Sequence, residues 1–225
     1  RVADAVVVPR EDVPGERRLV GYVVPADAPD APEADDAAAQ VQEWEELFDE
    51  TYAGDEAEDA TFDIGGWNSS YTGQPIPAEQ MREWVDATVD RILALRPRRV
   101  LEIGCGTGLL LHRVAPLCES YVATDFSATV LASLRRSLER HPIDTPLTLL
   151  HRAADDFGGM EPGSFDTIIL NSVVQYFPSA EYLARVIEGA ARVLAPGGRI
   201  LLGDLRSLPL LHAFSASVEL FRAPD

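Results

Sequence analysis

The sequence contains no lysine, so all 19 of its basic residues are arginines. They form no basic patch rich in aromatic residues, and nucleic acid is therefore not expected as a partner. No apolar run approaches the ~20 residues that a membrane-spanning helix needs, and the N-terminus has no signal-peptide core. We expect no membrane partner and a cytoplasmic location. Because the chain starts at Arg1 rather than at methionine, we interpret it as a piece of something longer.

Cysteine is equally scarce, with only Cys105 and Cys118. Two residues are too few for a disulfide framework or a cysteine zinc site, so no metal is expected and both thiols should be reduced. None of the four histidines has a partner pattern that marks a catalytic base; they are His112, His141, His151 and His212.

The net charge of −18 over 225 residues is concentrated in one window. Between Leu19 and Met81 there are 16 acidic residues and no arginine, and the rest of the chain carries only −2. Like charges repel and extend a chain, so this window is typical of a solvated connector rather than of a partner-binding surface.

The first part of the chain predicts a hairpin, a linker and two helices. Residues 1–25 hold two β-rich runs around a Pro14-Gly15 turn, and residues 26–40 are a low-complexity Ala, Pro and Asp linker. Apolar residues recur at helical spacing over 41–52 and again over 79–95.

From position 99 onward, strands alternate with helices. Strands are predicted at 99–103, 120–125, 147–151, 165–170 and 199–204. Helices are predicted at 109–117 and at 210–221. Two more are predicted with N-caps at Ser127 and Ser179, the second stopped by Pro196-Gly197-Gly198. This alternation predicts an α/β fold with a doubly wound, Rossmann-like parallel sheet.

The stretch "LEIGCGTG" sets Gly104, Gly106 and Gly108 between the first of these strands and its helix. Glycine permits a tight turn and close approach of a ligand to the backbone. A dinucleotide fingerprint would need glycine at Leu109, which makes a nicotinamide-dependent oxidoreductase a weak alternative. Asp125 ends the next strand, where an acid can bind both hydroxyls of a ribose or simply stabilise a helix start.

The stretch "GWNSSYTGQPIP", residues 66–77, mixes aromatic residues with turn formers. It is either a surface loop or part of a site. We interpret it as a lid, with Trp67 and Tyr71 lining the reaction pocket and with Asn68 and Ser69 hydrogen-bonding the cofactor or acceptor.

Several motifs carry a family resemblance. "VLEIGCGTGLLL", "DFS" at 125–127 and "LAPGGRILLGD" at 194–204 resemble the class I S-adenosylmethionine-dependent methyltransferases, over roughly residues 65–220. "GWNSSYTGQPIP", "NSVVQYFP" at 171–178 and "GDLRSLPLL" at 203–211 resemble the methyltransferase domains embedded in nonribosomal peptide synthetases.

The resemblance also implies a domain plan. "AVVVPREDVPGERRLVGYVVP", within residues 1–25, resembles the small C-terminal subdomain of an adenylation domain. Residues 26–62 would then be an acidic linker and helix, and residues 63–225 a methyltransferase domain that lacks its last strands. The whole would be an interrupted adenylation domain.

The resemblance implies an enzyme that N-methylates an aminoacyl group tethered to a phosphopantetheinyl carrier protein, using S-adenosyl-L-methionine. Its adenylation and carrier domains would be the partners. By matching position, the cofactor would be bound by Tyr71, Glu102, Gly104, Cys105, Gly106, Gly108, Asp125, Phe126, Asp155 or Asp156, and Asn171. The catalytic candidates are Tyr71, Asn171, Gln175, Tyr176 and Asp204, and the substrate contacts are Trp67, Asn68, Ser69, Gln175 and Arg206.

Methyl transfer from a sulfonium to an amine is an in-line displacement that depends on a neutral lone pair and on alignment. A general base is not required, although Asp204 is the best acidic candidate; both it and Arg206 could instead be helix-entry residues. The alternatives are methylation of oxygen, sulfur or carbon, and a non-catalytic spacer domain.

Overall fold

The structure is a computed structural model of the chain, and it describes residues 2–13, 16–25, 44, 49 and 59–223. The chain divides into two compact units, Arg1–Ala39 and Gln40–Asp225. The predicted linker at 26–40 lies outside the described residues. So does the predicted helix at 41–52, except for Trp44 and Asp49, which are both helical.

The first unit contains an antiparallel strand pair, which confirms the predicted hairpin strands. β1 (Val2–Val13) pairs with β2 (Glu16–Pro25), from Val2 opposite Pro25 to Val13 opposite Glu16. The predicted Pro14-Gly15 turn lies outside the described residues. The assignment of this pair to an adenylation subdomain stays a prediction.

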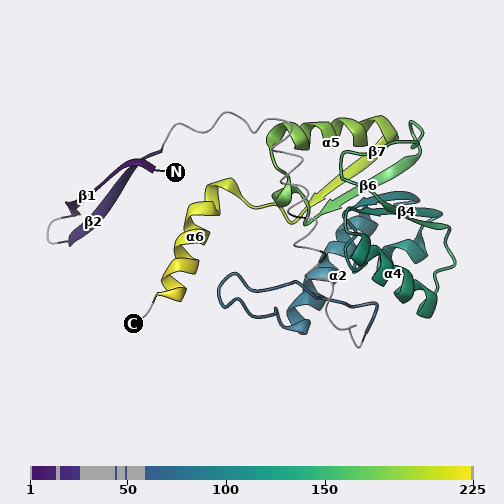
Figure 1. Cartoon of the computed structure of the whole chain (residues 1–225), viewed down its shortest axis with the longest axis horizontal. Coiled ribbons are helices and arrows are strands. Elements are labelled where there is room, and N and C mark those ends of the chain that lie inside the picture. The colour runs from purple at the N-terminus through teal and green to yellow at the C-terminus, as the bar shows by residue number, and fades with distance from the viewer. Residues whose placement is uncertain (1, 14–15, 26–43, 45–48, 50–58, 224–225) are drawn as a thin grey trace. The chain divides into compact units, whose positions relative to one another are not determined.

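The second unit is built on a five-stranded sheet in which every neighbouring pair is parallel, as predicted (Figure 1). The strands are β3 (Arg99–Ile103), β4 (Ser120–Asp125), β5 (Leu147–His151), β6 (Phe165–Asn171) and β7 (Leu194–Gly203). Their spatial order is β5-β4-β3-β6-β7. The chain adds β4 and β5 on one side of β3 and then crosses over to add β6 and β7 on the other side, so the switch point of the sheet lies between the neighbouring strands β3 and β6. Ligands of doubly wound sheets bind at such a switch point, at the carboxyl ends of the strands.

Helices cover both faces of this sheet (Figure 1). α2 (Ala78–Ala94), α3 (Leu111–Val114) and α4 (Ala128–Arg140) pack on one face, and α5 (Ala180–Val193) packs on the other. α6 (Leu208–Arg222) leads away from the sheet. Two short 3₁₀ turns are η1 (Ala115–Leu117) and η2 (Val174–Tyr176). Among the described residues, no helix combines the length and apolarity needed to cross a membrane.

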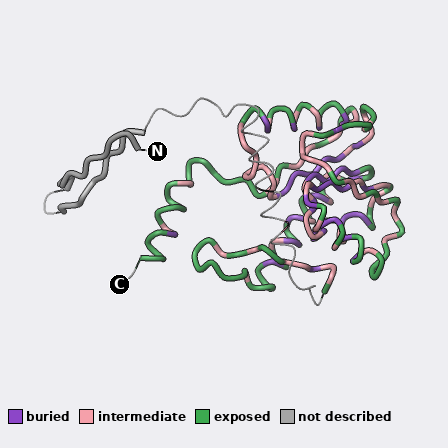
Figure 2. The backbone as a smooth tube through the Cα atoms, viewed as in Figure 1, coloured by how far each residue is buried: buried purple, intermediate pink, exposed green. Residues whose placement is uncertain are grey.

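Side-chain alternation along the strands creates two cores, which appear as the buried stretches of Figure 2. On one face, Val100 of β3 and Ile169 of β6 pack with residues of α2, α3 and α4. On the other face, Leu101 and Ile168 pack against Val186 and its neighbours on α5. Strands buried on both faces explain the continuous apolar runs in the sequence.

Both predicted serine caps are confirmed. The Oγ of Ser127 accepts a hydrogen bond from the backbone N–H of Val130, and the Oγ of Ser179 accepts one from that of Tyr182. These bonds satisfy N–H groups in the first turns of α4 and α5. They therefore fix where the chain leaves the carboxyl ends of β4 and η2.

Two predicted boundaries were wrong. The helix expected over 109–117 is α-helical only over Leu111–Val114 and continues as a 3₁₀ turn, with Pro116 at its start. Proline cannot donate the backbone bond that would extend the α-helix. The Pro196-Gly197-Gly198 stretch does not separate α5 from a strand at 199; it lies inside β7, at an irregularity in the pairing with β6.

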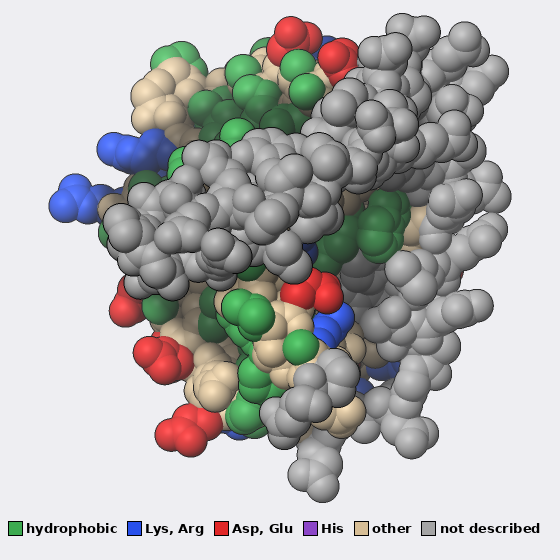
Figure 3. Space-filling view, turned by 90° about the vertical axis from the view of Figure 1, so that its left-hand side faces the viewer, with side chains coloured by type: hydrophobic (Ala, Val, Ile, Leu, Met, Phe, Trp, Pro, Cys, Tyr) green, Lys and Arg blue, Asp and Glu red, His purple; other side chains and the backbone are tan. Residues whose placement is uncertain are grey.

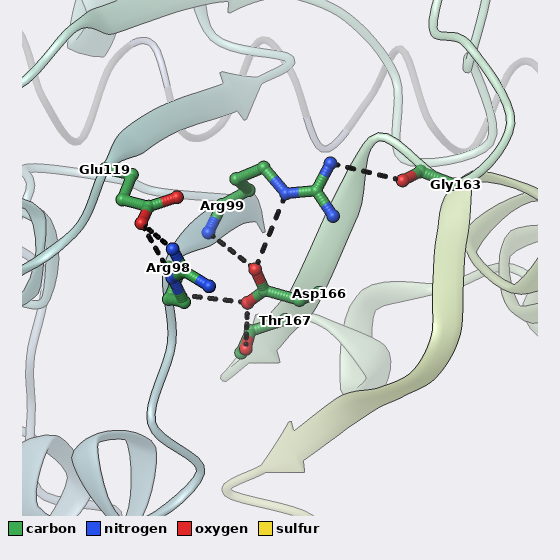
Figure 4. A network of polar contacts seen from close by, with 6 residues as sticks. All are labelled: Arg98, Arg99, Glu119, Gly163, Asp166 and Thr167. Carbon is green, nitrogen blue, oxygen red and sulfur yellow. Dashed lines mark hydrogen bonds and ion pairs between the residues drawn. The ribbon is translucent and has the colours of Figure 1, made fainter.

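A polar network ties the strands together at their amino ends (Figure 4). The carboxylate of Asp166 accepts hydrogen bonds from the backbone N–H groups of Arg98 and Arg99, at 3.0 and 2.9 Å. The Arg99 guanidinium also lies 3.7 Å from the same carboxylate, and that of Arg98 pairs with Glu119. The network holds β3 against β6 at the end of the sheet opposite the switch point.

The segment before α2 is packed rather than loose. Phe62, Trp67 and Ile76 join Met81 and Val85 of α2 in a third hydrophobic cluster. The backbone of this segment doubles back on itself, with an antiparallel bridge between Asn68 and Pro75. Its position is therefore defined by α2.

α6 has a largely open surface. Only its Val218 is buried, and Leu208, Leu210, Leu220 and Phe221 are more than half exposed. Figure 3 turns the side of the molecule on which α6 lies toward the viewer, and hydrophobic side chains lie open there among polar ones. This helix would gain stability from covering its apolar side chains.

Candidate active site

A cavity of about 420 Å³ lies at the switch point of the sheet. The carboxyl ends of β3, β4 and β6 and the residues after β7 contribute to its walls, together with the segment before α2 and the start of α5. Its size lies within the range of small-molecule sites. Among the residues that the structure describes, no group of three or more His, Cys, Asp or Glu side chains could hold a metal ion.

The glycine turn and Asp125 form one bonded unit in the cavity wall. The backbone N–H of Gly106 donates to Asp125 Oδ2 at 2.8 Å, and that of Ser127 donates to Oδ1 at 2.9 Å. Gly104 has φ 75°, and a Cβ on it would lie 2.5 Å from Val173. Glycine is thus required at 104 both by the backbone and by the closeness of the next loop.

Asp125 is only 5% exposed, and burial raises the pKa of its carboxyl, opposed by the N–H donors of Ser127, Gly106 and Phe126. An ionised carboxylate has about four acceptor positions. Gly106 bonds one carboxylate oxygen and Ser127 the other, and the remaining acceptor capacity can serve the hydroxyls of a ribose.

Glu102 lies deeper in the same wall and is 3% exposed. Its Oε2 accepts a hydrogen bond from the Tyr121 hydroxyl at 2.9 Å. Burial, together with the nearby charge of Asp125 and despite the Tyr121 bond, raises the pKa of Glu102 to about 8. Cys105 also lines the cavity, and burial raises the pKa of its thiol, which makes it unreactive.

The predicted adenine contacts are not all brought to the cavity. Phe126 lines it, but Asp155 and Asp156 do not. Asp155 accepts a hydrogen bond from the Tyr182 hydroxyl at 3.0 Å, and Asp156 accepts one from the backbone of Gly158 at 2.8 Å. These local bonds turn both carboxylates away. Arg152, Ala153, Ala154 and Tyr182 line the wall in their place.

The ends of β6 and β7 supply most of the polar groups on the opposite wall. Asn171, Gln175, Tyr176, Asp204 and Arg206 all line the cavity, as predicted from their positions after these strands. The side-chain oxygen of Gln175 is buried and has no hydrogen-bond partner among the described residues. A buried carbonyl oxygen without a donor is costly, and it marks a place where a ligand donor would be stabilised.

The segment 66–77 contributes a wall of the cavity. Trp67 and Asn68 line it, and the Trp67 ring packs on that of Trp84 at 4.6 Å. Ser69 and Tyr71 do not line it: Ser69 Oγ accepts a hydrogen bond from the Tyr71 backbone, and the Tyr71 side chain contacts α6. Gly108 also lies outside the lining, where a Cβ would approach Leu134 to 2.6 Å.

Sequence reasoning missed several lining residues, notably Trp44, Trp84, Arg152, Ser172, Tyr182 and Phe214. Trp84 of α2 packs in the third hydrophobic cluster and also lines the cavity. Arg152 directly follows β5, which was a usable signal since parallel strands end at one edge.

Comparison of the sequence with known proteins indicates the family to which the chain belongs. Residues 101–200 match the family described as a methyltransferase domain. The chain is 51% identical over 231 residues to chondramide synthase cmdD of Chondromyces crocatus. It is 47% identical over 223 residues to CymA of Salinispora arenicola, a probable nonribosomal peptide synthetase. Each alignment covers 99% of this chain but only 6% and 3% of those proteins, so the chain spans a small part of their length.

A solved structure supports the fold. The N-methyltransferase NodS from Bradyrhizobium japonicum, in complex with S-adenosyl-L-homocysteine, superimposes with a TM-score of 0.53. The alignment covers 78% of this chain and 82% of that one at 19% identity. At that identity the likeness concerns the fold alone.

The second unit is therefore a class I methyltransferase domain with a Rossmann-like fold. The chain belongs with the methyltransferase domains found in nonribosomal peptide synthetases, and the predicted family is confirmed. The family also confirms the predicted cofactor, S-adenosyl-L-methionine. The cavity volume and the remaining acceptor capacity of Asp125 fit this cofactor.

Proposed function

We propose that this chain is the methyltransferase of a nonribosomal peptide synthetase, and that it N-methylates an aminoacyl group tethered to a carrier protein. The similarity to segments of such synthetases supports the setting. The unpartnered carbonyl oxygen of Gln175 supports the acceptor, because an amine supplies the N–H donor that this oxygen lacks. This oxygen is the observation on which the choice of acceptor rests.

The residues fall into a cofactor side and an acceptor side. On the cofactor side, Glu102 and the turn at Gly104 and Gly106 hold the amino-acid end. Asp125 binds the ribose and Phe126 contacts the adenine. When bound, S-adenosyl-L-methionine supplies an electrophilic methyl group on a sulfonium. The peptide N–H groups of Gly104, Cys105 and Gly106 are bonded to the end of β4. The turn therefore contributes close approach of the cofactor to the backbone, since glycine has no Cβ.

On the acceptor side, Gln175 and Asn171 orient the amine, and Tyr176 and Arg206 contact the rest of the substrate. Alignment of this kind can supply ~7–11 kcal/mol of a barrier. As the new C–N bond replaces the C–S bond, positive charge moves to nitrogen, and one proton must then leave. Asp204 is exposed at the end of β7 and can pass that proton to solvent.

Trp67 and Asn68 form a wall that excludes water from the reacting atoms. Aromatic faces also stabilise the cationic transition state, at ~0.5–2 kcal/mol for each cation–π contact. Tyr71 acts indirectly in this proposal, by holding the segment against α6.

Other acceptors satisfy the site less well. A carbon or sulfur acceptor leaves the Gln175 oxygen without a strong donor, whereas a hydroxyl would satisfy it. Methylation of oxygen is therefore the main alternative. A non-catalytic spacer would have no need of the glycine turn bonded to Asp125 or of an open cavity at the switch point.

The partners proposed are the adenylation and carrier domains of the same synthetase. Residues 1–25 would be part of the adenylation domain, into which residues 63–225 are inserted. A tethered thioester has no free carboxylate, so the carrier would deliver an aminoacyl group whose α-amine is available as the acceptor.

The test is to supply the protein with an aminoacyl-loaded carrier domain and S-adenosyl-L-methionine labelled at the methyl group. Tandem mass spectrometry of the released amino acid then locates the label. We expect it on the α-nitrogen. Label on a side-chain oxygen, sulfur or carbon would reject N-methylation, and absence of both transfer and S-adenosyl-L-homocysteine binding would leave only the spacer reading.

A further inference from the structure

Two adjacent strand ends carry the same unusual backbone. Ser172 directly follows β6 and has φ 59°, and Asp204 directly follows β7 and has φ 57°. Left-handed backbone at residues other than glycine is uncommon, and it persists where surrounding contacts hold it. Both residues line the cavity.

The two residues are bonded to each other and to Asn171. The Ser172 hydroxyl donates to Asp204 Oδ2 at 2.8 Å, and the Asn171 side-chain Nδ2 donates to Ser172 Oγ at 3.0 Å. The backbone N–H of Ser172 donates to the carbonyl of Gly203 at 3.2 Å, which joins the two strand ends.

The chain of bonds has a direction. An ionised carboxylate only accepts hydrogen bonds, so the single hydrogen of Ser172 points to Asp204. The Ser172 oxygen is then left to accept, and it takes the N–H of the Asn171 amide. This fixes which end of the amide is engaged and leaves the carbonyl Oδ1 of Asn171 without a hydrogen bond from any described residue.

Gly203 makes room for that arrangement. A Cβ at position 203 would lie 2.0 Å from Asn171 Oδ1, far inside any real contact. The position has no left-handed backbone that would otherwise demand glycine. Its lack of a side chain is therefore explained by the placement of the Asn171 carbonyl.

We propose that Ser172 is a positioning residue, which with Asp204 and Gly203 holds the Asn171 carbonyl oxygen as a fixed acceptor for an N–H of the amine to be methylated. This inference rests on the proposed N-methylation. Gln175 Oε1 takes the second N–H of a primary amine. When both hydrogens are held, the nitrogen lone pair has a single direction, which is the condition for in-line attack.

The first test uses Ser172→Gly and Gly203→Ala in the protein, with a panel of aminoacyl N-acetylcysteamine thioesters as acceptors. Glycine suits φ 59° better than serine, so any loss in Ser172→Gly comes from the hydroxyl. We expect kcat to fall about 10–100-fold in both variants, since a misplacement of ~1 Å can cost that much. The KM for S-adenosyl-L-methionine and the Kd for S-adenosyl-L-homocysteine should stay within about twofold. Leu202→Ala, at a neighbouring exposed position on β7, is the matched control.

The second test exchanges the amide and the carboxylate between positions 171 and 204. A merely structural role of these residues does not predict that the second substitution restores activity. Asn171→Asp alone puts two carboxylates around one serine hydrogen, and should lower kcat about 100-fold. Adding Asp204→Asn supplies a donor for the Ser172 oxygen and reverses the chain of bonds, so it should restore kcat at least about tenfold.

Transfer to amines that is unaffected in Ser172→Gly and Gly203→Ala, or a double variant no better than Asn171→Asp, would overturn the positioning of Asn171 while leaving N-methylation intact. A wild-type protein that binds S-adenosyl-L-homocysteine and methylates no amine would overturn both.

Discussion

At the scale of single residues, the surroundings of Glu102 disfavour the ionised form of its carboxyl. Its pKa of about 8 compares with an ordinary value of 4.5, because the side chain is buried beside Asp125. A raised pKa means that the folded protein holds this proton more tightly than the unfolded chain does. The contribution of this proton to the free energy of unfolding is fully present below pH 4.5 and is lost as the pH rises toward 8.

Glu102→Gln removes this titration while it keeps an acceptor for the Tyr121 hydroxyl. At about 1.4 kcal/mol per pKa unit, we expect the variant to be more stable than the wild type by about 2–4 kcal/mol at pH 8, and by little at pH 4.5. Urea unfolding at the two pH values measures the difference. An equal effect at both values would show that Glu102 does not titrate in this range.

The residues of the site could be predicted only in part, and the reason is local hydrogen bonding. Gly104, Gly106 and Asp125 are set by strand-end positions that the sequence makes visible. Asp155 and Asp156 lie in the loop after β5, where they accept hydrogen bonds from Tyr182 and from the Gly158 backbone. The strand pattern does not show which acid will be hydrogen-bonded by a neighbouring loop or helix residue and so be kept out of the site.

At the scale of elements, the segment 66–77 is bonded to α6, although 146 positions of sequence separate Tyr71 from Ser217. The Tyr71 hydroxyl lies 2.9 Å from Ser217 Oγ, and the Tyr71 ring packs edge-on against Phe221 at 5.5 Å. The Arg222 guanidinium donates to the backbone carbonyls of Ser70 and Tyr71, at 2.5 and 3.2 Å. This clasp holds the wall formed by Trp67 and Asn68.

Tyr71→Ala should therefore loosen the segment without unfolding the sheet. Loss of one hydrogen bond and the ring contacts corresponds to ~1–2 kcal/mol, or a factor of about 5–30 in local opening. Limited proteolysis, followed by mapping of the cleavage sites, should show faster cutting within 66–77 by that factor. Leu220→Ala, an exposed position on α6, should leave the cutting unchanged. Equal cutting of both variants would contradict the clasp.

Elements were predictable where the pattern is periodic or capped. The strands and α4 and α5 followed from apolar runs and from Ser127 and Ser179. The clasp was not predictable, because Tyr71 and Ser217 are separated by 146 positions and no sequence pattern links them. Likewise, no pattern announces that Ser172 and Asp204 have left-handed backbone, since glycine is the residue that normally signals it.

At the scale of the whole molecule, the fold class followed from the alternation of strands and helices, and the family followed from the motifs. The order β5-β4-β3-β6-β7 places the glycine turn, Asp125 and Asn171 at one edge although they are far apart in sequence. Parallel pairing alone achieves this, because it brings all carboxyl ends together. The assignment of residues 1–25 to an adenylation domain stays a prediction.

The central claim is that the glycine turn and the Asp125 carboxylate bind the cofactor together. Isothermal titration of S-adenosyl-L-homocysteine into the wild type and into Asp125→Ala tests it most directly, with circular dichroism to verify folding. Asp144→Ala, an exposed acid between α4 and β5, is the control. Two lost hydrogen bonds to a charged group predict an affinity at least about 100-fold weaker for Asp125→Ala and an unchanged one for Asp144→Ala. A folded Asp125→Ala variant that binds as tightly as the wild type would contradict the account.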